Sequence, residues 1–497
     1  MKRIIVIAVF CAYFCSFAKS SGASVRTYDY PPEVKSSQRY TLKVDGLPVL
    51  VMDHPVPASF AAFELDEAAE IEIECTHDVK WVDVRPLKTG IQPKIVDGKI
   101  VFTVPAPGNY SIEINGKLDH PLFIFANPKE VKPMRSNADI IFFEAGKIHK
   151  PGVICPKSNQ QVYVEGGAIV IGAISATGVE NVKVSGYGIL DGSFNNQMTK
   201  QELTTIFSVE GGYTVANKYQ RFVEFIDSRN ITIEGLILTN STTWQVVPIN
   251  CDHITIRGLK IISDNPSDDG IDVVRSRKVR ISDCFVRTKD DCVAVKAHLD
   301  YPESVIVDDV LIEKCVFWNA AWGNALEIGF ELHCDEVKNI IFRDCDIIHV
   351  ESGAVFSIHN SEKATVKNVF FENIRVEDAR QKLADLAIFR SRYCTDGSSD
   401  DEYVRENYLA GAWDGVLKVP EQNRAYHAQF RGKIENIHFN DICVEGIFPF
   451  SIISGFDEAH KVSNVTFTNI TNNGKKINIM EELKLFVEFA GEIIIKN

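Results

Sequence analysis

Two short acidic clusters have residue types and spacing that suit acid–base chemistry. Asp268 and Asp269 precede Gly270, and Asp290 and Asp291 follow after an apolar alternation without a helical period. Carboxylates crowded within a few ångströms raise one another's pKa and resist joint ionisation. Such crowding can keep one group protonated as an acid while another acts as a base, as glycoside hydrolysis requires. The alternative is that these are solvated turn residues, since Asp favours turns.

The chain that carries these clusters begins with an export pattern. Residues 1–20 contain a short basic region, an apolar run and then small residues. This order is typical of a secretory signal peptide, so we expect an exported protein, either periplasmic or secreted. No later segment has the roughly 18 consecutive apolar residues of a transmembrane helix, so we expect no membrane insertion.

The composition narrows the range of partners. The chain has 53 Lys and Arg against 67 Asp and Glu, a net charge of -14. This balance argues against nucleic acid, whose phosphate backbone needs a basic binding surface. No cluster of Cys and His has the spacing of a zinc site, and we expect neither a metal nor another cofactor.

The cysteines are interpreted as mainly structural. Of the 12 cysteines, Cys11 and Cys15 lie in the signal segment. Cys284, Cys315 and Cys345 occupy equivalent places in three similar phrases about 30 residues apart. Equivalent places in stacked repeats indicate small buried hydrophobic residues in one ladder. Disulfides, which are common in exported proteins, are the alternative.

The rest of the chain divides into two regions. Residues 21–130 contain short alternating segments separated by Gly, Pro and Asp, which predict a small antiparallel β-sandwich. Residues 131–497 repeat a strand-turn-strand phrase, whose copies begin at Asn181, Asn230, His253, Lys278, Asp309, Asn339, Asn368, Asn436 and Asn464. One such unit cannot bury its apolar face alone, so the units must stack.

A right-handed parallel β-helix satisfies this repeat, and we therefore predict an all-β chain in which the β-helix follows the sandwich. The wider gap between the last repeats indicates an insertion over about residues 380–432. Insertions on solenoids commonly build the binding surface, so this segment is expected near the substrate.

Several phrases resemble the polygalacturonase family of β-helix glycoside hydrolases and its relatives, the dextranases. Residues 163–168 and 186–192 are similar to the family's early coils. Residues 267–272 resemble its Asn-Thr-Asp-Gly motif, and residues 289–296 resemble Gly-Asp-Asp-Cys-Ile-Ala-Ile-Lys. The resemblance covers about residues 130–475 and implies a secreted, inverting hydrolase of a polysaccharide or oligosaccharide.

The resemblance also implies roles for the acids. Asp290 corresponds to the acid that protonates the leaving oxygen, while Asp269 and Asp291 correspond to the groups that hold and activate water. Adjacent side chains of a strand point to opposite faces. Asp290 and Asp291 can therefore share a site only if the backbone bends between them. Asp268 is interpreted as a turn residue.

Two departures from the family bear on the substrate. Gly323-Asn324-Ala325 replaces the family's Gly-His-Gly, and residues 355–360 lack the Arg and Lys of the motif that holds a uronate carboxylate. The dextranases also lack that histidine and carry a sandwich before the β-helix. A pectin or polygalacturonate-like substrate is favoured, because most chains resembling this family act on pectin. A dextranase-like hydrolase of a neutral α-glucan and a non-catalytic glycan-binding β-helix are the alternatives.

Seven further residues are predicted to bind the substrate: Lys296, Trp322, Asn324, Glu327, His359, Arg390 and Arg392. Lys296 is expected to touch the sugar or to steady Asp290, with a simple surface cation as the alternative. Glu327 lies in the coil that carries the family's histidine and is either a substrate contact or a half-buried strand residue. His359 lies where the cationic motif is expected. Arg390 and Arg392, in the insertion, are the remaining candidates to hold an acidic sugar. Trp322 is a stacking surface or a core residue, and we expect a monomer.

Overall fold

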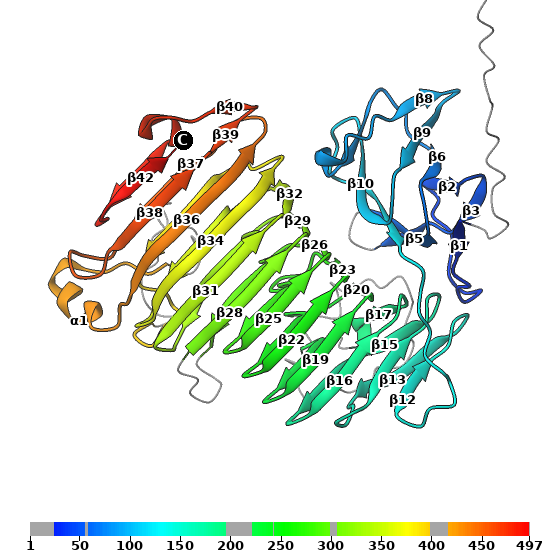
Figure 1. The fold of residues 1–497 in the computed structure, drawn as a ribbon, viewed down its shortest axis with the longest axis horizontal. Helices are drawn as coiled ribbons and strands as arrows, with labels where there is room; N and C mark the ends of the chain where they lie inside the picture. Colours follow the sequence, from blue (N-terminus) through cyan, green and yellow to red (C-terminus); the bar gives the residue numbers. More distant parts are fainter. Residues whose placement is uncertain are drawn as a thin grey trace, which may run out of the picture.

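The computed structural model describes residues 24–54, 58–194, 221–241, 243–298, 306–397 and 416–496. The signal segment predicted over residues 1–20 lies outside this part of the chain. Strands dominate the described residues, as two small N-terminal sheets followed by one long parallel array (Figure 1). In the described part of the chain, no helix has the length and apolar character needed to cross a membrane.

The N-terminal region forms two facing sheets with one shared core. The first sheet contains β1 (Val25–Thr27), β4 (Met52–His54), β5 (Ala58–Leu65), β7 (Val82–Arg85), β10 (Gly108–Ile114) and β11 (Leu122–Asn127). The second contains β2 (Tyr40–Val44), β3 (Leu47–Val49), β6 (Ala69–Cys75), β8 (Lys94–Val96) and β9 (Lys99–Val104). The alternation in β6 buries Ile71 and Ile73 in this core and leaves the intervening glutamates outside it.

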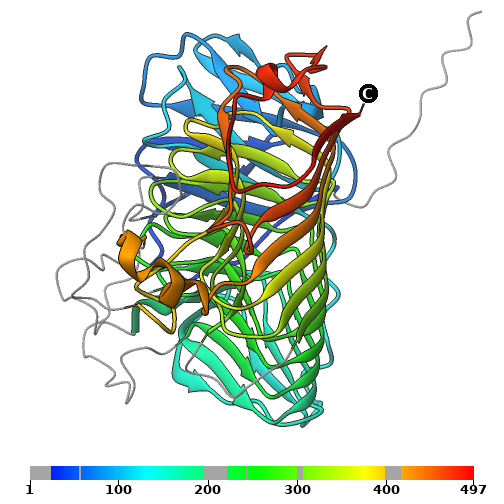
Figure 2. The ribbon, with the colours of Figure 1, turned by 90° about the vertical axis from the view of Figure 1, so that its left-hand side faces the viewer.

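The remaining strands wind into three parallel ladders, which we call sheets A, B and C (Figures 1 and 2). Sheet A contains β18 (Val223–Ile226), β21 (Val246–Ile249), β24 (Ile271–Val274), β27 (Val293–Ala297), β30 (Leu326–Leu332), β33 (Ala354–Asn360), β35 (Lys382–Ile388), β37 (Phe450–Ser454) and β41 (Leu485–Glu488). Sheet B contains β12 (Ile140–Phe143), β14 (Gln161–Val164), β16 (Glu180–Ser185), β19 (Arg229–Glu234), β22 (Asp252–Arg257), β25 (Arg277–Ser282), β28 (Ile306–Glu313), β31 (Glu336–Arg343), β34 (Thr365–Val376), β36 (Lys433–Val444), β38 (Val462–Thr468) and β42 (Ile493–Lys496).

Sheet C contains β13 (Ile148–Ile154), β15 (Ile169–Thr177), β17 (Ile189–Asp191), β20 (Ile237–Thr239), β23 (Lys260–Ile262), β26 (Phe285–Thr288), β29 (Val316–Asn319) and β32 (Asp346–Val350). The ends of β34 and β36 continue this sheet to β39 (Thr471–Asn472), beside which β40 (Lys475–Lys476) pairs. In each ladder a strand pairs in parallel with the equivalent strand of the next coil, as Ile254 does with Val279. The predicted all-β class, a parallel β-helix after a small β-sandwich, is confirmed.

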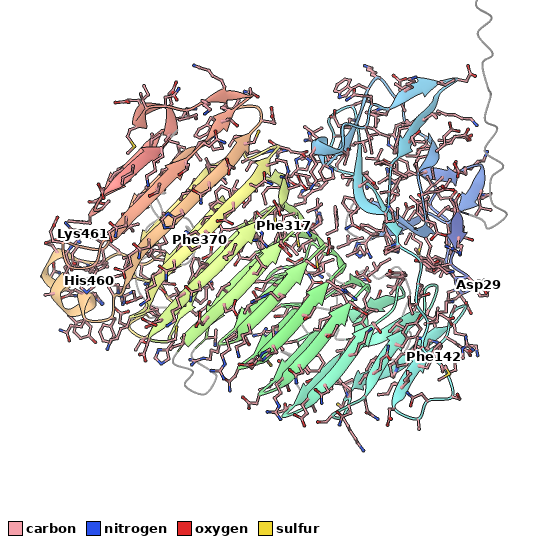
Figure 3. The ribbon with its side chains drawn as sticks, viewed as in Figure 1. Asp29, Phe142, Phe317, Phe370, His460 and Lys461 are labelled. Atoms are coloured by element: carbon pink, nitrogen blue, oxygen red, sulfur yellow. The ribbon has the colours of Figure 1, made fainter. Side chains whose placement is uncertain are left out.

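Equivalent residues stack inside and outside the coils. Phe342, Phe371, Phe439 and Phe467 form an interior row with ring centroids 5.0, 5.0 and 4.8 Å apart. On the outside, Phe370 of β34, labelled in Figure 3, stacks on a histidine of β36 at 4.8 Å. The ten cysteines that follow the signal segment all lie among the described residues and are free thiols. The interior phenylalanine row shows that repeating one side chain in successive coils builds the core.

Asparagines begin most repeats because they adopt a left-handed bend within the strands of sheet B. Asn339, Asn368 and Asn436 have φ angles of 56°, 57° and 59°. Asn tolerates this left-handed region better than most residues that have a Cβ. Their side chains also form a ladder, in which Asn368 Nδ2 donates to Asn339 Oδ1 at 3.2 Å and Asn436 Nδ2 donates to Asn368 Oδ1 at 3.4 Å. The recurring Asn thus fixes both the bend and the register of the coils.

The predicted insertion is shorter than its sequence boundaries. β35 lies within residues 380–432, yet it pairs with β33 and β37 as a regular strand of sheet A. The segment that leaves the coil therefore begins after Ile388. Its described part contains a short 3₁₀ turn, Glu421–Asn423, and α1, Arg424–Ala428, which lies beside the coils (orange in Figure 2).

The sandwich packs against sheet C. Phe123 of β11 lies 4.9 Å from Phe285 of β26, measured between ring centroids. Arg85 Nη1 of β7 forms an ion pair of 2.7 Å with Glu377 Oε2 of the β-helix. Because these contacts cover sheet C, sheet A is left as the face on which the sequence-predicted acids can meet a substrate.

A pair of substitutions at Asn368 tests the asparagine ladder. Ala is expected to lower the free energy of unfolding by about 2 kcal/mol, because a left-handed backbone costs a residue with a Cβ roughly 1–2 kcal/mol and the side-chain hydrogen bonds are lost as well. Gly loses the same bonds but adopts this φ without strain, so Asn368→Gly is expected to cost about half as much. Urea unfolding followed by circular dichroism measures both, and equal losses would contradict the backbone argument.

Candidate active site

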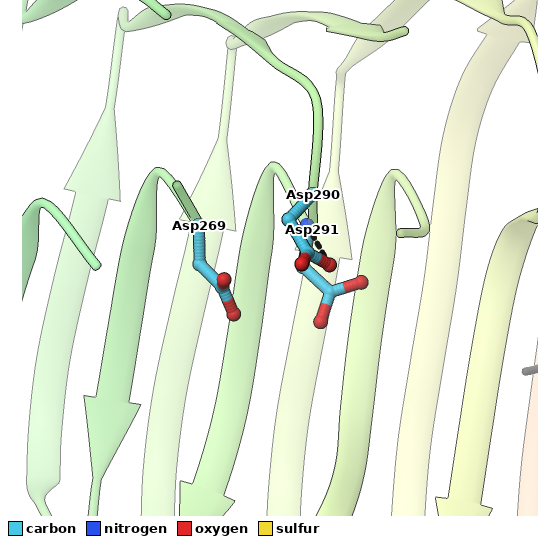
Figure 4. A group of neighbouring side chains, drawn as sticks. All are labelled: Asp269, Asp290 and Asp291. Atoms are coloured by element: carbon cyan, nitrogen blue, oxygen red, sulfur yellow. Dashed lines mark hydrogen bonds between the residues drawn. The ribbon is translucent and has the colours of Figure 1, made fainter. Parts of the chain in front are cut away.

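Neighbouring coils bring the three predicted aspartates together at one edge of sheet A. Asp269 comes directly before β24, and Asp290 and Asp291 lie in the bend between β26 and β27. The two coils are joined here by a hydrogen bond of 2.8 Å from Gly270 N to Asp291 O. One carboxylate oxygen from each aspartate lies within 4.8 Å of the others (Figure 4).

Asp268 builds the bend that lets consecutive aspartates face the same site. Its Oδ1 accepts hydrogen bonds from Lys289 N at 3.0 Å and Asp290 N at 2.9 Å, and its Oδ2 accepts one from Asn265 N at 2.9 Å. The carboxyl is fully buried, and burial raises its pKa to about 6 in spite of these donors. The expected backbone bend is present, and Asp268 serves it as a turn residue.

Gly323 holds the same bend from the next coil. A Cβ at this position would lie 2.3 Å from the carbonyl carbon of Asp290 and 2.3 Å from Asp291 N, which is closer than real contacts allow. Cys292 N also donates to Asn324 O at 2.9 Å, which continues the ladder past the acids. The Gly retained from the family's Gly-His-Gly motif therefore has a packing role here.

Lys296 on β27 supplies the positive charge among the acids. Its Nζ lies 2.6 Å from Asp269 Oδ2, 3.8 Å from Asp272 Oδ1 and 4.0 Å from Asp291 Oδ2. Burial alone lowers the pKa of this ammonium, but Asp269 and Asp272 outweigh burial and raise the pKa well above its usual value. Of the two roles expected for Lys296, the geometry favours steadying an acid, and that acid is Asp269.

Asp290 and Asp291 differ in how well their charged forms are stabilised. Burial, and next the charge of Asp269, raise the pKa of both carboxyls well above the usual value for Asp. Asp291 Oδ1 accepts Asn324 N at 2.7 Å and Asn324 Nδ2 at 3.4 Å. Within the described residues, Asp290 accepts one side-chain hydrogen bond, from Asp291 N at 3.1 Å. These donors favour the ionised form of Asp291, while its deeper burial and the charge of Glu327 oppose it.

Solvent exposure also distinguishes Asp290 from the other two acids. Asp290 is half-buried, while Asp269 and Asp291 are 2% and 8% exposed. Asp290, whose pKa is raised, is thus also the most accessible of the three acids. This combination suits a general acid at Asp290, with Asp269 and Asp291 beneath it.

A buried polar row continues from Asp291 along sheet A. Asn324 Nδ2 donates to Glu327 Oε2 at 3.0 Å, and Glu327 Oε2 lies 3.1 Å from His359 Nδ1. His359 Nε2 lies 3.4 Å from Asp385 Oδ2, and Asp385 is paired with Lys382 at 2.7 Å. Burial opposes a charge on His359, but Glu327 and Asp385 on either side raise its pKa to about 10.

This row changes the interpretation of three predicted substrate contacts. Glu327 and His359 are 1% and 0% exposed, and both amide hydrogens of Asn324 are directed at protein carboxylates. None of these side chains presents a donor or acceptor to the solvent side of the site. The geometry therefore assigns Asn324, Glu327 and His359 to holding Asp291 from behind.

The predicted cations of the insertion are placed differently from each other. Arg390 is buried, and its Nη2 and Nε donate to Asp396 O at 2.7 and 3.1 Å. These bonds give Arg390 a structural role inside its own loop. Arg392 is exposed, and its guanidinium lies 4.6 Å above the Tyr393 ring, which stacks on Phe330 at 5.8 Å.

Three neighbours of the acids were not among the predicted contacts. Trp244 packs its ring between Lys296 and Arg221, with each cation 4.1 Å from the ring centroid. Lys289 lies 4.3 Å above the ring of Trp322, which is 48% exposed as expected for a stacking surface. Lys289 carried a signal in the sequence, because it replaces the first Gly of the Gly-Asp-Asp-Cys motif. Arg221 follows no motif, and only the fold places it here.

A cluster of acids on one face of a parallel β-helix supplies the paired carboxyls that glycoside hydrolysis needs. A family model, Glycosyl hydrolases family 28, matches residues 149–399. The chain belongs to this family, and the resemblance seen in its motifs is confirmed.

Curated relatives agree over part of their length. The polygalacturonase of Juniperus ashei is 37% identical over 221 residues, which is 43% of this chain and 40% of the relative. That of Chamaecyparis obtusa is 24% identical over 222 residues, 43% of this chain and 39% of the relative. The chain thus spans about two fifths of the length of these relatives.

Solved structures share the fold. An exopolygalacturonase from Thermotoga maritima superposes with a TM-score of 0.52 at 18% identity and covers 72% of this chain and 83% of its own. Dex49A from Penicillium minioluteum superposes with a TM-score of 0.56 at 14% identity, over 93% of this chain and 95% of its own. The second alignment extends over most of the sandwich as well as the β-helix.

Glu327→Gln tests the electrostatic link between the buried row and Asp291. The charge of Glu327 helps to raise the pKa of Asp291, so its removal is expected to lower that pKa, and Asp291 then ionises at lower pH. The carboxyl ¹³C resonance of Asp291, assigned with Asp291→Asn, follows this titration. Asp385→Asn is the matched control, because His359 separates Asp385 from Asp291, and a smaller shift is expected. A Glu327→Gln protein in which Asp291 titrates at the same or a higher pH would contradict the link.

Proposed function

We propose that this protein is an exported glycoside hydrolase that cleaves a polysaccharide by inverting acid–base catalysis without a cofactor. The observation that carries the proposal is that three carboxyls with different surroundings each place an oxygen within 4.8 Å of the others. Asp290 is accessible and favours its protonated form, while Asp269 faces the ammonium of Lys296 at 2.6 Å. Split protonation in one carboxyl cluster is what cleavage of a glycosidic bond needs.

The reaction then follows from proton positions. Asp290 gives its proton to the glycosidic oxygen as the bond to the anomeric carbon breaks. Asp291, with Asp269, orients a water molecule and takes a proton from it, while the water oxygen bonds to the anomeric carbon from the opposite side. Lys296 holds Asp269 in place through their 2.6 Å contact during these steps. The two products leave with Asp290 ionised and Asp291 protonated, and solvent exchange resets both groups.

A pectin or polygalacturonate-like substrate is favoured, since the curated relatives matched over this region are polygalacturonases. A neutral α-glucan is the second candidate, because residues 355–360 contain neither Arg nor Lys, and Lys296 and His359 are engaged by protein carboxylates. A non-catalytic glycan-binding protein is the third. It has no physical reason to keep three carboxyls crowded, because their mutual repulsion costs free energy that binding alone does not recover.

Export and a monomeric state complete the proposal. Residues 1–20 have the basic, apolar and small-residue order of a signal peptide, which supports export. A polysaccharide is too large to enter a cell intact, so an exported enzyme meets it where it occurs. Size-exclusion chromatography of the mature chain tests the monomer.

Asp290→Asn is the direct test of the general acid. Asn cannot supply the proton, so turnover is expected to fall by about 10²–10⁴-fold, the usual contribution of general acid catalysis. Reducing ends released from polygalacturonate, pectin and dextran report the rate, and circular dichroism reports the fold. Asp335→Asn, at an exposed turn outside the acid cluster, is the matched control and is expected to keep wild-type activity. A folded Asp290→Asn protein with near wild-type turnover would remove Asp290 from the mechanism.

Inversion of configuration is the second expected outcome. Direct attack by water gives a first product whose anomeric configuration is opposite to that of the bond cleaved. The carboxyl oxygens lie closer than the roughly 6.5–9.5 Å typical of inverting enzymes, but Asp290 and Asp291 are consecutive residues, so chain connectivity sets that distance. Proton NMR in the first minutes of the reaction identifies the anomer. Retention, or a trapped glycosyl-enzyme, would contradict direct attack.

A further inference from the structure

An aromatic–ammonium pair is formed by residues adjacent in sequence to the bend that carries the acids. Lys289 directly precedes Asp290, and its Nζ lies 4.3 Å above the ring of Trp322. Trp322 in turn precedes Gly323, which packs against the peptide bond between Asp290 and Asp291. The pair is therefore anchored through the backbone on both sides to the residues that would carry out the reaction.

Trp322 is held in a conformation that serves no packing purpose. Its φ angle of 96° is rare for a bulky residue, and its side chain is 48% exposed, so the indole gains little from the core. Ser352 fixes this backbone by accepting Trp322 N at 2.8 Å and donating to Trp322 O at 3.2 Å. A strained backbone that presents an exposed aromatic face beside reactive groups points to a binding role.

Lys289 differs from the other cations around the acids. Lys296 is paired with Asp269, His359 lies between Glu327 and Asp385, Lys382 is paired with Asp385, and Arg390 is bonded to Asp396. Within the described residues, Lys289 Nζ has no carboxylate oxygen within 4.0 Å, so its charge is not used by an ion pair there. Lys289 also stands at the position of the first Gly of the Gly-Asp-Asp-Cys motif.

We propose that Lys289 and Trp322 form a subsite for a uronate residue next to the cleaved bond. The sugar ring packs its C–H face on the indole, and the Lys289 ammonium leaves the aromatic face to pair with the sugar carboxylate. The flexible four-carbon stem of Lys allows this movement. A neutral sugar gains the stacking contact alone, so the difference in affinity between the two sugars comes from the one ion pair. This inference rests on the proposed function, because it names the substrate class of the same site.

The experiment distinguishes the contribution of the sugar carboxylate to affinity from that of ring stacking. It measures affinity in a variant that does not turn over the substrate. Oligogalacturonate and its fully methyl-esterified form share one sugar chain and differ in charge. Their affinities are measured by calorimetry on Asp290→Asn, which binds without cleaving, and on the same protein carrying Lys289→Met or Trp322→Ala. Lys433→Met, which removes an exposed lysine of sheet B, is the matched control.

Lys289→Met is expected to weaken binding of oligogalacturonate by about tenfold at low salt, with the loss shrinking at higher ionic strength. Binding of the methyl ester should stay unchanged, as should both affinities of Lys433→Met. Trp322→Ala should weaken both ligands to a similar extent. Unchanged binding of oligogalacturonate by Lys289→Met, equal losses on both ligands, or no binding of either ligand would overturn the subsite. Turnover by the wild-type protein and its loss in Asp290→Asn judge the proposed function separately.

Discussion

The spacing between stacked coils is the constraint on which the rest of this structure depends. Strands in a parallel ladder lie about 4.8 Å apart, so residues at equivalent places in successive coils are held one strand apart whatever their chemistry. For Phe371 and Phe439 this spacing produces a ring stack, and for Asn339 and Asn368 it produces an amide ladder. For Asp269 and Asp291 it places two carboxylates together, which their charges alone would oppose. The backbone therefore imposes the crowding that acid–base chemistry needs.

Crowded acids stay in place because other coils neutralise and support them. Lys296, one strand above Asp269, offsets the charge of that carboxylate at 2.6 Å. Behind Asp291, carboxylates and cations alternate along the row from Glu327 through His359 and Asp385, so the row has little net charge. Such a row of hydrogen bonds and ion pairs orients Asn324 beside Asp291. Glu327, His359 and Asp385 lie in successive coils. The parallel pairing of these coils keeps the three side chains aligned.

The sequence predicted those features that repeat and missed those that depend on how different coils face each other. The recurring phrases predicted the coils, and the spacing of Asp269 from Asp290 and Asp291 predicted their meeting, because both follow from one strand per coil. Lys296 lies at the bulge where the register between β27 and β30 shifts. The charged partners of His359 come from two other coils, so no repeat pattern in the sequence marks either environment. Arg390 was expected at the substrate because it is a cation in an insertion, but the carbonyl group that binds it comes from the folded loop itself.

The separation of sheets and turns explains how such a fold divides catalysis from recognition. The acids sit where strands begin and are fixed by backbone hydrogen bonds between coils, such as that from Gly270 N to Asp291 O. Lys289 and Trp322 lie in the turns just before β27 and β30, and their side chains are not part of the interior rows. A substitution in these turns changes the side chains available to contact a sugar. The coil that positions the acids keeps its hydrogen bonds and its core. The sandwich covers sheet C. On sheet A, the strands fix the geometry of the acids, and the turns before these strands can vary in sequence and so change substrate specificity.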